Sequence, residues 1–155
     1  MSRPSFVYKT YINASAEAVW RGLVDPEFTR LYWMHDNVSD WAVGSRWEHV
    51  QVEPPEGTEA PWEVEPGKAD IVGEVVESDR PRRLVITWAS PQHEGDPART
   101  SRVAFDLEPI DWPGGPWTKL VLAHTDMDDE MAASVSEGWP MVLSGMKTLL
   151  ERSAA

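Results

Sequence analysis

The residue of this sequence best suited to bind a ligand or to transfer a proton near neutral pH is His124. It closes the run 120–124, in which strand alternation puts its ring on the same side as Leu120 and Leu122, toward the interior. A core histidine bonded to a backbone carbonyl would show the same pattern. The sequence therefore leaves a functional and a structural role open for His124.

His49 is the second candidate, because it shares a predicted strand face with Trp47. An inward-facing histidine beside an aromatic ring could supply the polar group of a largely apolar site. The other two histidines, His35 and His93, are expected to lie in loops.

The acidic run 126–130 directly follows His124 and invites a metal interpretation. A calcium loop needs a turn glycine and a bidentate glutamate at set positions, and the run has neither. Carboxylates at a helix start, where the helix dipole favours negative charge, explain the run better. The sequence has no cysteine and none of the patterns of zinc proteases, serine hydrolases or nucleotide-binding loops. We therefore expect no metal site and no cofactor.

Nine tryptophans are the anomaly of the composition. Aromatic rings dominate the walls of small-molecule sites, but they also fill cores and anchor loops. We expect a cavity lined by inward-facing aromatic and aliphatic residues, in which His124 or Tyr32 fixes the orientation of a ligand. The candidate lining residues are Tyr32, Trp33, Trp47, His49, Trp88, Phe105, Leu122, His124, Trp139 and Leu143.

Apolar alternation between turn residues predicts strands at 6–12, 46–52, 69–77, 84–89, 102–108 and 118–125. Two short helices follow the first strand, one over 16–23 with Ser15 as its N-cap and one starting at Asp25-Pro26. The stretch 33–43 is expected to be irregular. The segment 53–68, rich in proline and glutamate, is expected to be a loop or a ragged strand edge. Its Trp62 would either cover a cavity or lie at an exposed hairpin tip.

A long C-terminal helix is predicted by an apolar stripe at helical spacing. The stripe consists of Val135, Trp139, Val142, Met146 and Leu149, with Leu143 and Leu150 beside it. Short connections between the strands indicate an antiparallel meander in which each strand has one apolar face. The fold expected is α+β, a curved antiparallel sheet wrapped around the long C-terminal helix, with two short helices after the first strand. A gap between helix and sheet should remain.

The length of 155 residues fits one domain, 1–155. A net charge of -12 argues against DNA, RNA and anionic membrane surfaces as partners, because phosphate binding relies on clustered Lys and Arg. No apolar run is long enough to insert into a membrane, and the first residues lack the apolar core of a signal peptide. The expected location is the cytoplasm.

Four stretches of the chain resemble START-like (SRPBCC) domains. Residues 6–27 resemble the strand-plus-helix opening of these domains. Residues 73–88 are similar to the central hairpin of one branch, the activator of heat-shock-protein-90 ATPase homologue-like proteins. Residues 118–127 and 136–151 resemble the last strand and C-terminal helix of that branch, with Gly138-Trp139 as the most specific element. The resemblance covers almost the whole chain and implies a helix-grip fold with a cavity between sheet and helix.

Related branches bind lipids, hormones or polyketides, so the resemblance implies binding of a small, mostly hydrophobic molecule in this cavity. An enzyme of the cyclase or hydrolase type stays open and would need a convergent acid–base pair there. A chaperone-linked protein-interaction module also stays open and would need an exposed apolar or charged patch. A homodimer is compatible with each. The segments 53–68 and 111–117 depart from the family and would reshape the cavity mouth.

Overall fold

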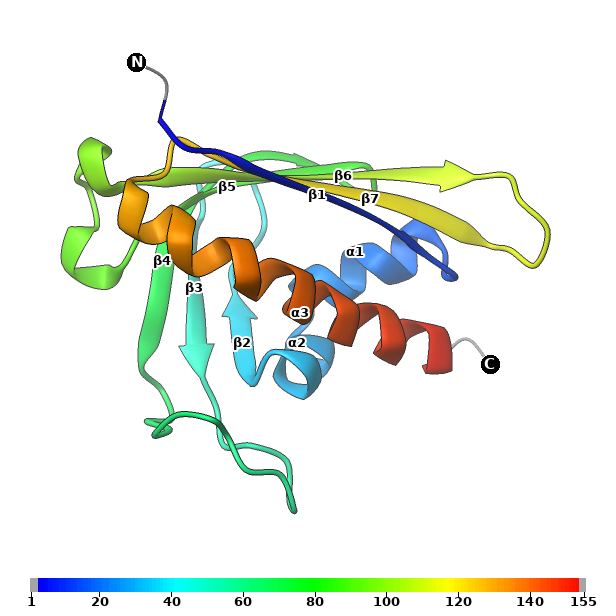
Figure 1. The fold of residues 1–155 in the computed structure, drawn as a ribbon, viewed down its shortest axis with the longest axis horizontal. Helices are drawn as coiled ribbons and strands as arrows, with labels where there is room; N and C mark the ends of the chain where they lie inside the picture. The colour runs from blue at the N-terminus through cyan, green and yellow to red at the C-terminus, as the bar shows by residue number, and fades with distance from the viewer. Residues whose placement is uncertain (1–2, 154–155) are drawn as a thin grey trace.

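The computed structural model describes residues 3–153 and contains one seven-stranded antiparallel sheet, in the order β1-β7-β6-β5-β4-β3-β2. The strands are β1 (Phe6–Ile12), β2 (His35–Val38), β3 (Arg46–Gln51), β4 (Ala69–Asp79), β5 (Arg83–Trp88), β6 (Ser101–Ile110) and β7 (Trp117–Thr125). The helices are α1 (Ala16–Val24), α2 (Pro26–Tyr32) and α3 (Asp129–Ser153), with short 3-10 turns η1 (Pro91–His93) and η2 (Pro97–Arg99). Figure 1 shows α3 crossing the curled sheet.

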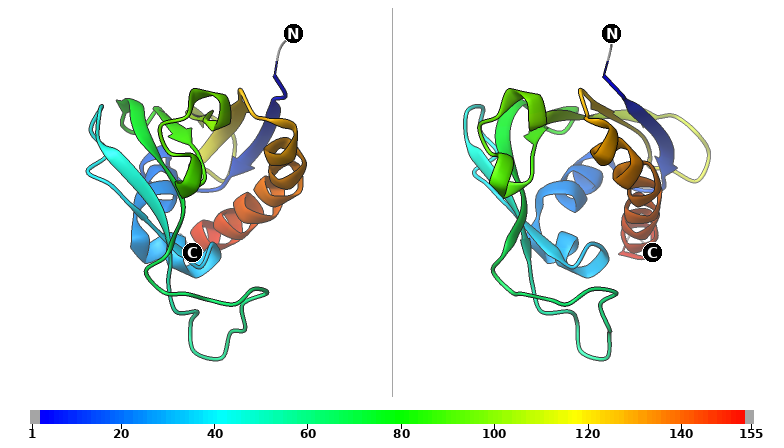
Figure 2. Two further views of the ribbon diagram at one scale, coloured as in Figure 1. Left: turned by 90° about the vertical axis from the view of Figure 1, so that its left-hand side faces the viewer. Right: turned by 60° about the vertical axis from the view of Figure 1, so that its left-hand side comes forward.

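This arrangement is the α+β helix-grip fold that the sequence predicts, with two short helices after the first strand. Figure 2 shows the sheet curling around the helices, with α1 and α2 closing one side of the curl beside α3. Ser15 caps α1 as expected, because its hydroxyl accepts a hydrogen bond from the amide of Ala18 at 3.1 Å. Asp25 caps α2 in the same way through the amide of Glu27.

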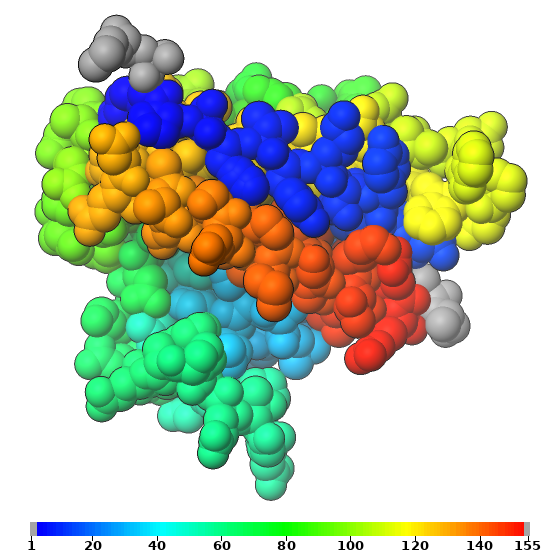
Figure 3. Space-filling model, in the orientation of Figure 1, coloured from blue at the N-terminus to red at the C-terminus, as the bar shows by residue number. Residues whose placement is uncertain are grey.

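The apolar face of α3 packs against the interior with Trp139, Leu143, Met146 and Leu150 buried. Val135 and Val142 are half-buried at its margin. Burying these side chains is the main reason that the helix lies across the sheet, because apolar burial contributes roughly 1.5–3 kcal/mol per large side chain. Figure 3 shows α3 between β1 on one side and the segment 53–68 on the other.

The prediction that 33–43 is irregular was wrong for residues 35–38, which form strand β2. The strand pairs antiparallel with β3, and His35 lies opposite Gln51. His35 is therefore in a strand and buried, not in a loop. The four residues of β2 are mostly polar and show no apolar alternation, so their pattern gave no strand signal.

Gly73, on β4, lies opposite Trp47 of β3. The indole Nε1 of Trp47, on β3, reaches across β4 and donates a hydrogen bond to the carbonyl oxygen of Thr87, on β5, at 2.7 Å. A Cβ atom at residue 73 would overlap that carbonyl oxygen and the indole nitrogen. The missing side chain thus lets Trp47 join two strands that are not neighbours.

The segment 53–68 has turns and bends but neither helix nor strand, as predicted. It leaves the sheet between β3 and β4 and projects away from it (Figure 1). Two backbone hydrogen bonds with Gln51 hold its base. The amide of Gly67 donates to the carbonyl oxygen of Gln51, and the amide of Gln51 donates to the carbonyl oxygen of Lys68. Among the helices of residues 3–153, none is both long and apolar enough to cross a membrane.

Candidate functional site

His124 lies on β7 in a closed chain of hydrogen bonds beneath α3. The indole Nε1 of Trp139 can only donate, and it lies 3.0 Å from His124 Nδ1, which is therefore an acceptor. His124 Nε2 then carries the ring proton and donates to Ser101 Oγ at 2.7 Å. Ser101 in turn donates to the carbonyl oxygen of Trp88 at 3.1 Å. Both ring nitrogens are used by the protein itself.

Burial lowers the pKa of His124 to about 4. Its side chain is fully buried, and a protonated ring would lose the acceptor that Trp139 needs. The neutral ring is thus the stable form at neutral pH. A ligand could bond to His124 only by displacing Trp139 or Ser101, so its predicted role as a polar anchor stays a prediction that this geometry does not favour.

His49, on β3, is held differently. The amide nitrogen of Asn37 donates to the carbonyl oxygen of Leu23 at 2.9 Å, which turns the amide oxygen toward His49. That oxygen lies 2.6 Å from His49 Nδ1, so Nδ1 carries the proton. Nε2 makes no hydrogen bond within residues 3–153, and because no buried side-chain nitrogen or oxygen there lacks a partner, this atom keeps some exposed surface. His49 therefore keeps one free ring acceptor.

His35, on β2, stacks on His49 with ring centroids 3.9 Å apart and planes 6° from parallel. Its Nδ1 faces the carbonyl oxygen of Trp33 at 2.7 Å, and its Nε2 faces the carboxylate of Asp70 at 2.8 Å. Desolvation first, and then the neighbouring His35, lower the pKa of His49 well below its usual value. The enzyme hypothesis requires a convergent acid–base pair, and Asp70 with His35 is one such pair in direct contact here.

The space between sheet and α3 is largely filled by aromatic rings. The Trp33 ring centroid lies 4.3 Å from that of His49, 5.4 Å from that of Trp139 and 6.4 Å from that of Trp88. Phe105 meets the edge of Trp139 at 6.0 Å. Trp33 therefore packs against core rings of the sheet and of α3 at the same time.

Two hollows open on either side of Trp33, and we call the larger the side pocket. It has a volume of about 670 Å³ between α3, the α2–β2 corner and the segment 53–68. Its apolar wall is Tyr32, Trp33, Met34, Pro61, Trp62, Met141 and Val142. Its polar wall is His35, Gln51, Glu63 and Asp70. The smaller hollow, about 130 Å³, lies between Trp33, Trp88 and Trp139 along α3.

Four of the predicted cavity residues line these hollows, namely Tyr32, Trp33, Trp88 and Trp139. The hydroxyl of Tyr32 donates to the carbonyl oxygen of Gly22 at 2.8 Å, and burial raises its pKa, so it is a structural donor. The other six lie in the packed interior and line neither hollow, and their contact with a ligand stays a prediction. They are Trp47, His49, Phe105, Leu122, His124 and Leu143.

Sequence reasoning missed the polar wall of the side pocket. Gln51 donates to both carboxylate oxygens of Asp70, at 3.0 and 3.1 Å, and accepts from the amide of Glu65 at 2.8 Å. These bonds tie the loop 53–68 to the sheet and bring Trp62 to within 5.8 Å of the His35 ring. The one signal available was Trp62 itself, an aromatic residue in an acidic loop.

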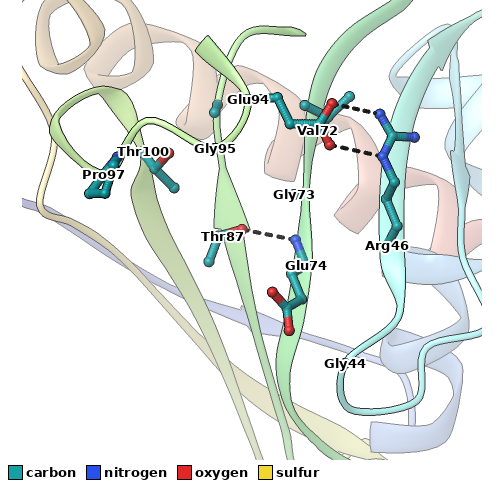
Figure 4. Close-up of a pocket in the computed structure, with 11 residues that line it drawn as sticks. Gly44, Arg46, Val72, Gly73, Glu74, Thr87, Glu94, Gly95, Pro97 and Thr100 are labelled. Carbon is teal, nitrogen blue, oxygen red and sulfur yellow. Dashed lines mark hydrogen bonds and ion pairs between the residues drawn. The ribbon is translucent and has the colours of Figure 1, made fainter.

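A further hollow of about 520 Å³ lies on the outer face of β3, β4 and β5, away from α3. Figure 4 shows the ion pair between Arg46 and Glu94 at its rim and the contact between Glu74 and Thr87 in its floor. The guanidinium makes two hydrogen bonds to the carboxylate of Glu94, at 2.9 and 3.0 Å. Its one cationic side chain, Arg46, is thus already paired with Glu94, and the hollow lacks the aromatic wall of the side pocket.

Comparisons with known proteins agree with this fold. The family model described as Activator of Hsp90 ATPase homolog 1-like protein matches residues 13–151. Protein MLL2253 from Mesorhizobium loti is 25% identical with a TM-score of 0.71, covering 96% of this chain and 98% of that one. An HSP90 activator, PFC0360w from Plasmodium falciparum, is 21% identical with a TM-score of 0.59, covering 79% of this chain and 73% of that one. The Aha1 dimer from Colwellia psychrerythraea is 17% identical with a TM-score of 0.67, covering 96% of both chains. No curated protein matches the chain.

Proposed function

The chain belongs to the Activator of Hsp90 ATPase homolog 1-like protein family, and from that premise we propose that it binds a small, mostly hydrophobic molecule in the side pocket. The observation that carries the proposal is the pocket of about 670 Å³ between α3, the α2–β2 corner and the segment 53–68, which has a mainly aromatic and aliphatic wall. Small-molecule sites are commonly of this size and combine such walls with a few fixed polar groups.

The shape of the pocket supports the same function. Trp33 and Val142 line both hollows, so a ligand body could lie over the Trp33 ring along α3. Asp70, Gln51 and His35 form one hydrogen-bonded group and present polar atoms at a single place. A ligand would therefore have its apolar part against α3 and its polar part toward β4.

Binding can be tested with a neutral naphthalene-based dye whose emission rises in apolar surroundings. Met141 lines the pocket on α3, and Met141→Asn should weaken dye binding about fivefold because part of an apolar contact is lost. Val43→Asn is the matched control, since Val43 is similarly exposed but does not line the pocket. Equal dye affinity in both variants, or no binding by the wild type, would contradict the proposal.

A second candidate is assembly with another copy of the chain through the end of the β6–β7 hairpin. Tyr11, Ile110, Trp112 and Trp117 line a shallow hollow of about 280 Å³ there, and Trp112 is 68% exposed. Large exposed aromatic rings mark interaction surfaces, and one structural relative is described as a dimer. Sedimentation should then find a wild-type dimer and a Trp112→Ser monomer. A monomeric wild type would remove this candidate.

A further inference from the structure

We infer that the side pocket selects lipophilic cations, that is, molecules with an apolar or aromatic body and an amine or quaternary ammonium group. This inference rests on the proposed function, because it names the chemical class of the ligand for the same pocket. It comes from the pairing of aromatic faces with carboxylates in one hollow, and from the charge of the residues around it.

The aromatic part of the pocket consists of Tyr32, Trp33 and Trp62. Tyr32 and Trp33 stack with centroids 5.9 Å apart, and they form one continuous surface on the α2 side. Trp62 approaches from the loop, with 41% of its surface exposed. Tryptophan faces attract cations most strongly among the aromatic residues, and quaternary ammonium groups are bound in this way.

The charged part of the pocket is acidic. Glu63 and Asp70 line it, and none of its lining residues in the described chain is a lysine or an arginine. The Glu63 carboxylate makes no ion pair with any residue in 3–153. A cation that enters would therefore meet a negative charge that no side chain of the pocket neutralises.

His35 is the one basic side chain of the pocket, and its hydrogen bonds limit its effect. Its ring nitrogens face the carbonyl oxygen of Trp33 and the carboxylate of Asp70, so any positive charge on the ring is shared with Asp70. Gln51 holds the same carboxylate from the other side. Since the Asp70 carboxylate is engaged by His35 and Gln51, Glu63 is the lining residue that leaves the pocket with an unpaired negative charge.

The charge of the whole chain acts in the same direction. With a net charge of -12, the protein repels anions and raises the local concentration of cations at its surface. A fatty acid or another lipophilic anion would bring its carboxylate to Glu63 and Asp70 without a lysine or arginine of the pocket to receive it. Hydrophobic bodies can enter with any head group, but the charge of the head group should decide the affinity.

Three probes with one body test this selection. They are 6-phenylhexyl-trimethylammonium, its neutral analogue in which carbon replaces the nitrogen, and 7-phenylheptanoate, which carries a carboxylate on the same phenylhexyl chain. Displacement of the neutral dye from the wild-type protein, at fixed ionic strength, would give the three dissociation constants. We expect the cation to bind roughly tenfold more tightly than the neutral analogue, and the anion to bind most weakly.

Variants locate the selection in the pocket. Trp62→Leu keeps an apolar side chain but removes the aromatic face, and it should cut the cation-to-neutral ratio to about threefold or less. Glu63→Gln should lower the ratio similarly, whereas Glu59→Gln, in the same loop but outside the pocket, should leave it unchanged. Melting curves of each variant would show that the fold is kept.

The outcomes separate the two proposals. Equal affinities for all three probes, or tightest binding of the anion, would overturn the selection of cations and leave hydrophobic binding standing. Equal ratios in Glu63→Gln and Glu59→Gln would also overturn it, because the charge would not act from the pocket. If neither the dye nor any probe binds to the wild type, the proposed function fails and the selection fails with it.

Discussion

His124 and His49 lie on the inner face of one sheet and are both buried, yet their rings have different partners. Both nitrogens of His124 are bonded, one to Trp139 and one to Ser101. His49 has one nitrogen bonded to Asn37 and one without a partner in the described residues. Strand alternation predicts the same inward orientation for both residues. Side chains from distant elements decide which of the two rings keeps a nitrogen free for a further hydrogen bond.

The same difference separates two regions of the molecule. The closed region, β5–β7 with α3, has its polar groups bonded and its volume filled by rings such as Trp88 and Trp139. The open region, β2–β4 with the segment 53–68, has a polar group around Asp70 and a hollow above it. Function should therefore reside in the open region, and stability in the closed one.

The largest expected effect is that of Trp139→Ala in the closed region. The ring is buried against Trp33, Trp88 and Phe105, so its loss should lower the free energy of unfolding by about 3–5 kcal/mol. Urea unfolding monitored by far-UV circular dichroism would measure it. Trp139→Phe keeps most of the volume but leaves His124 Nδ1 without its donor, at a smaller cost of about 1–3 kcal/mol. A change under about 0.5 kcal/mol in both would place the ring at the surface.

The next effect is a dependence of stability on pH. The pKa of His124 is about 4 in the folded protein, against a usual value near 6.5 in the unfolded chain. Between these values the unfolded state binds more protons, so stability is fully present above about pH 6.5 and falls as the pH drops toward 4. The shift corresponds to about 3 kcal/mol over that window.

The variant His124→Gln isolates this contribution, since glutamine can still accept from Trp139 and donate to Ser101 but does not titrate there. Urea unfolding at several values between pH 4 and 7 should give a flatter curve for the variant than for the wild type. His49, whose pKa is also lowered, contributes in the same direction in both proteins. If the free energy of unfolding depended on pH equally in the variant and the wild type, His124 would not be the neutral ring with both nitrogens hydrogen-bonded that is described above.

Most of the closed region could be predicted from the sequence, because it follows local periodicity. The alternation in Leu84, Ile86 and Trp88 and the stripe through Trp139 and Leu143 fixed the faces of β5 and α3. The centre of the stripe differs from the prediction by one position, since Leu143 and Leu150 are buried whereas Val142 and Leu149 are half-buried.

The open region could not be predicted, because its structure comes from side-chain bonds between distant residues. Strand β2 is polar, and His35 and Asn37 find their partners on β4 and β3. The position of Trp62 depends on Gln51, which bonds the loop backbone and Asp70 at once. The spacing of apolar residues along the sequence gives no information about such contacts.

A moderate effect is expected from Asp70→Ala in the open region. The carboxylate accepts from Gln51 and faces His35 Nε2, so its loss should lower the free energy of unfolding by about 1 kcal/mol. Glu74→Ala, which removes an exposed carboxylate from the same strand, should change it by less than about 0.5 kcal/mol. Equal effects of the two variants in urea unfolding would show that the polar group around Asp70 adds nothing beyond a surface charge.

The smallest effect on stability is expected from Trp62→Leu. The ring belongs to a loop without helix or strand, and 41% of its surface is exposed, so the free energy of unfolding should change by less than about 0.5 kcal/mol. Trp139 and Trp62 are thus the same residue type at the two extremes of the molecule, one needed for folding and the other free to serve a ligand. A loss of 2 kcal/mol or more in Trp62→Leu, measured by the same urea unfolding, would extend the packed core to the loop. The division into a closed and an open region would then be wrong, because the wall of the side pocket would itself be part of what holds the fold together.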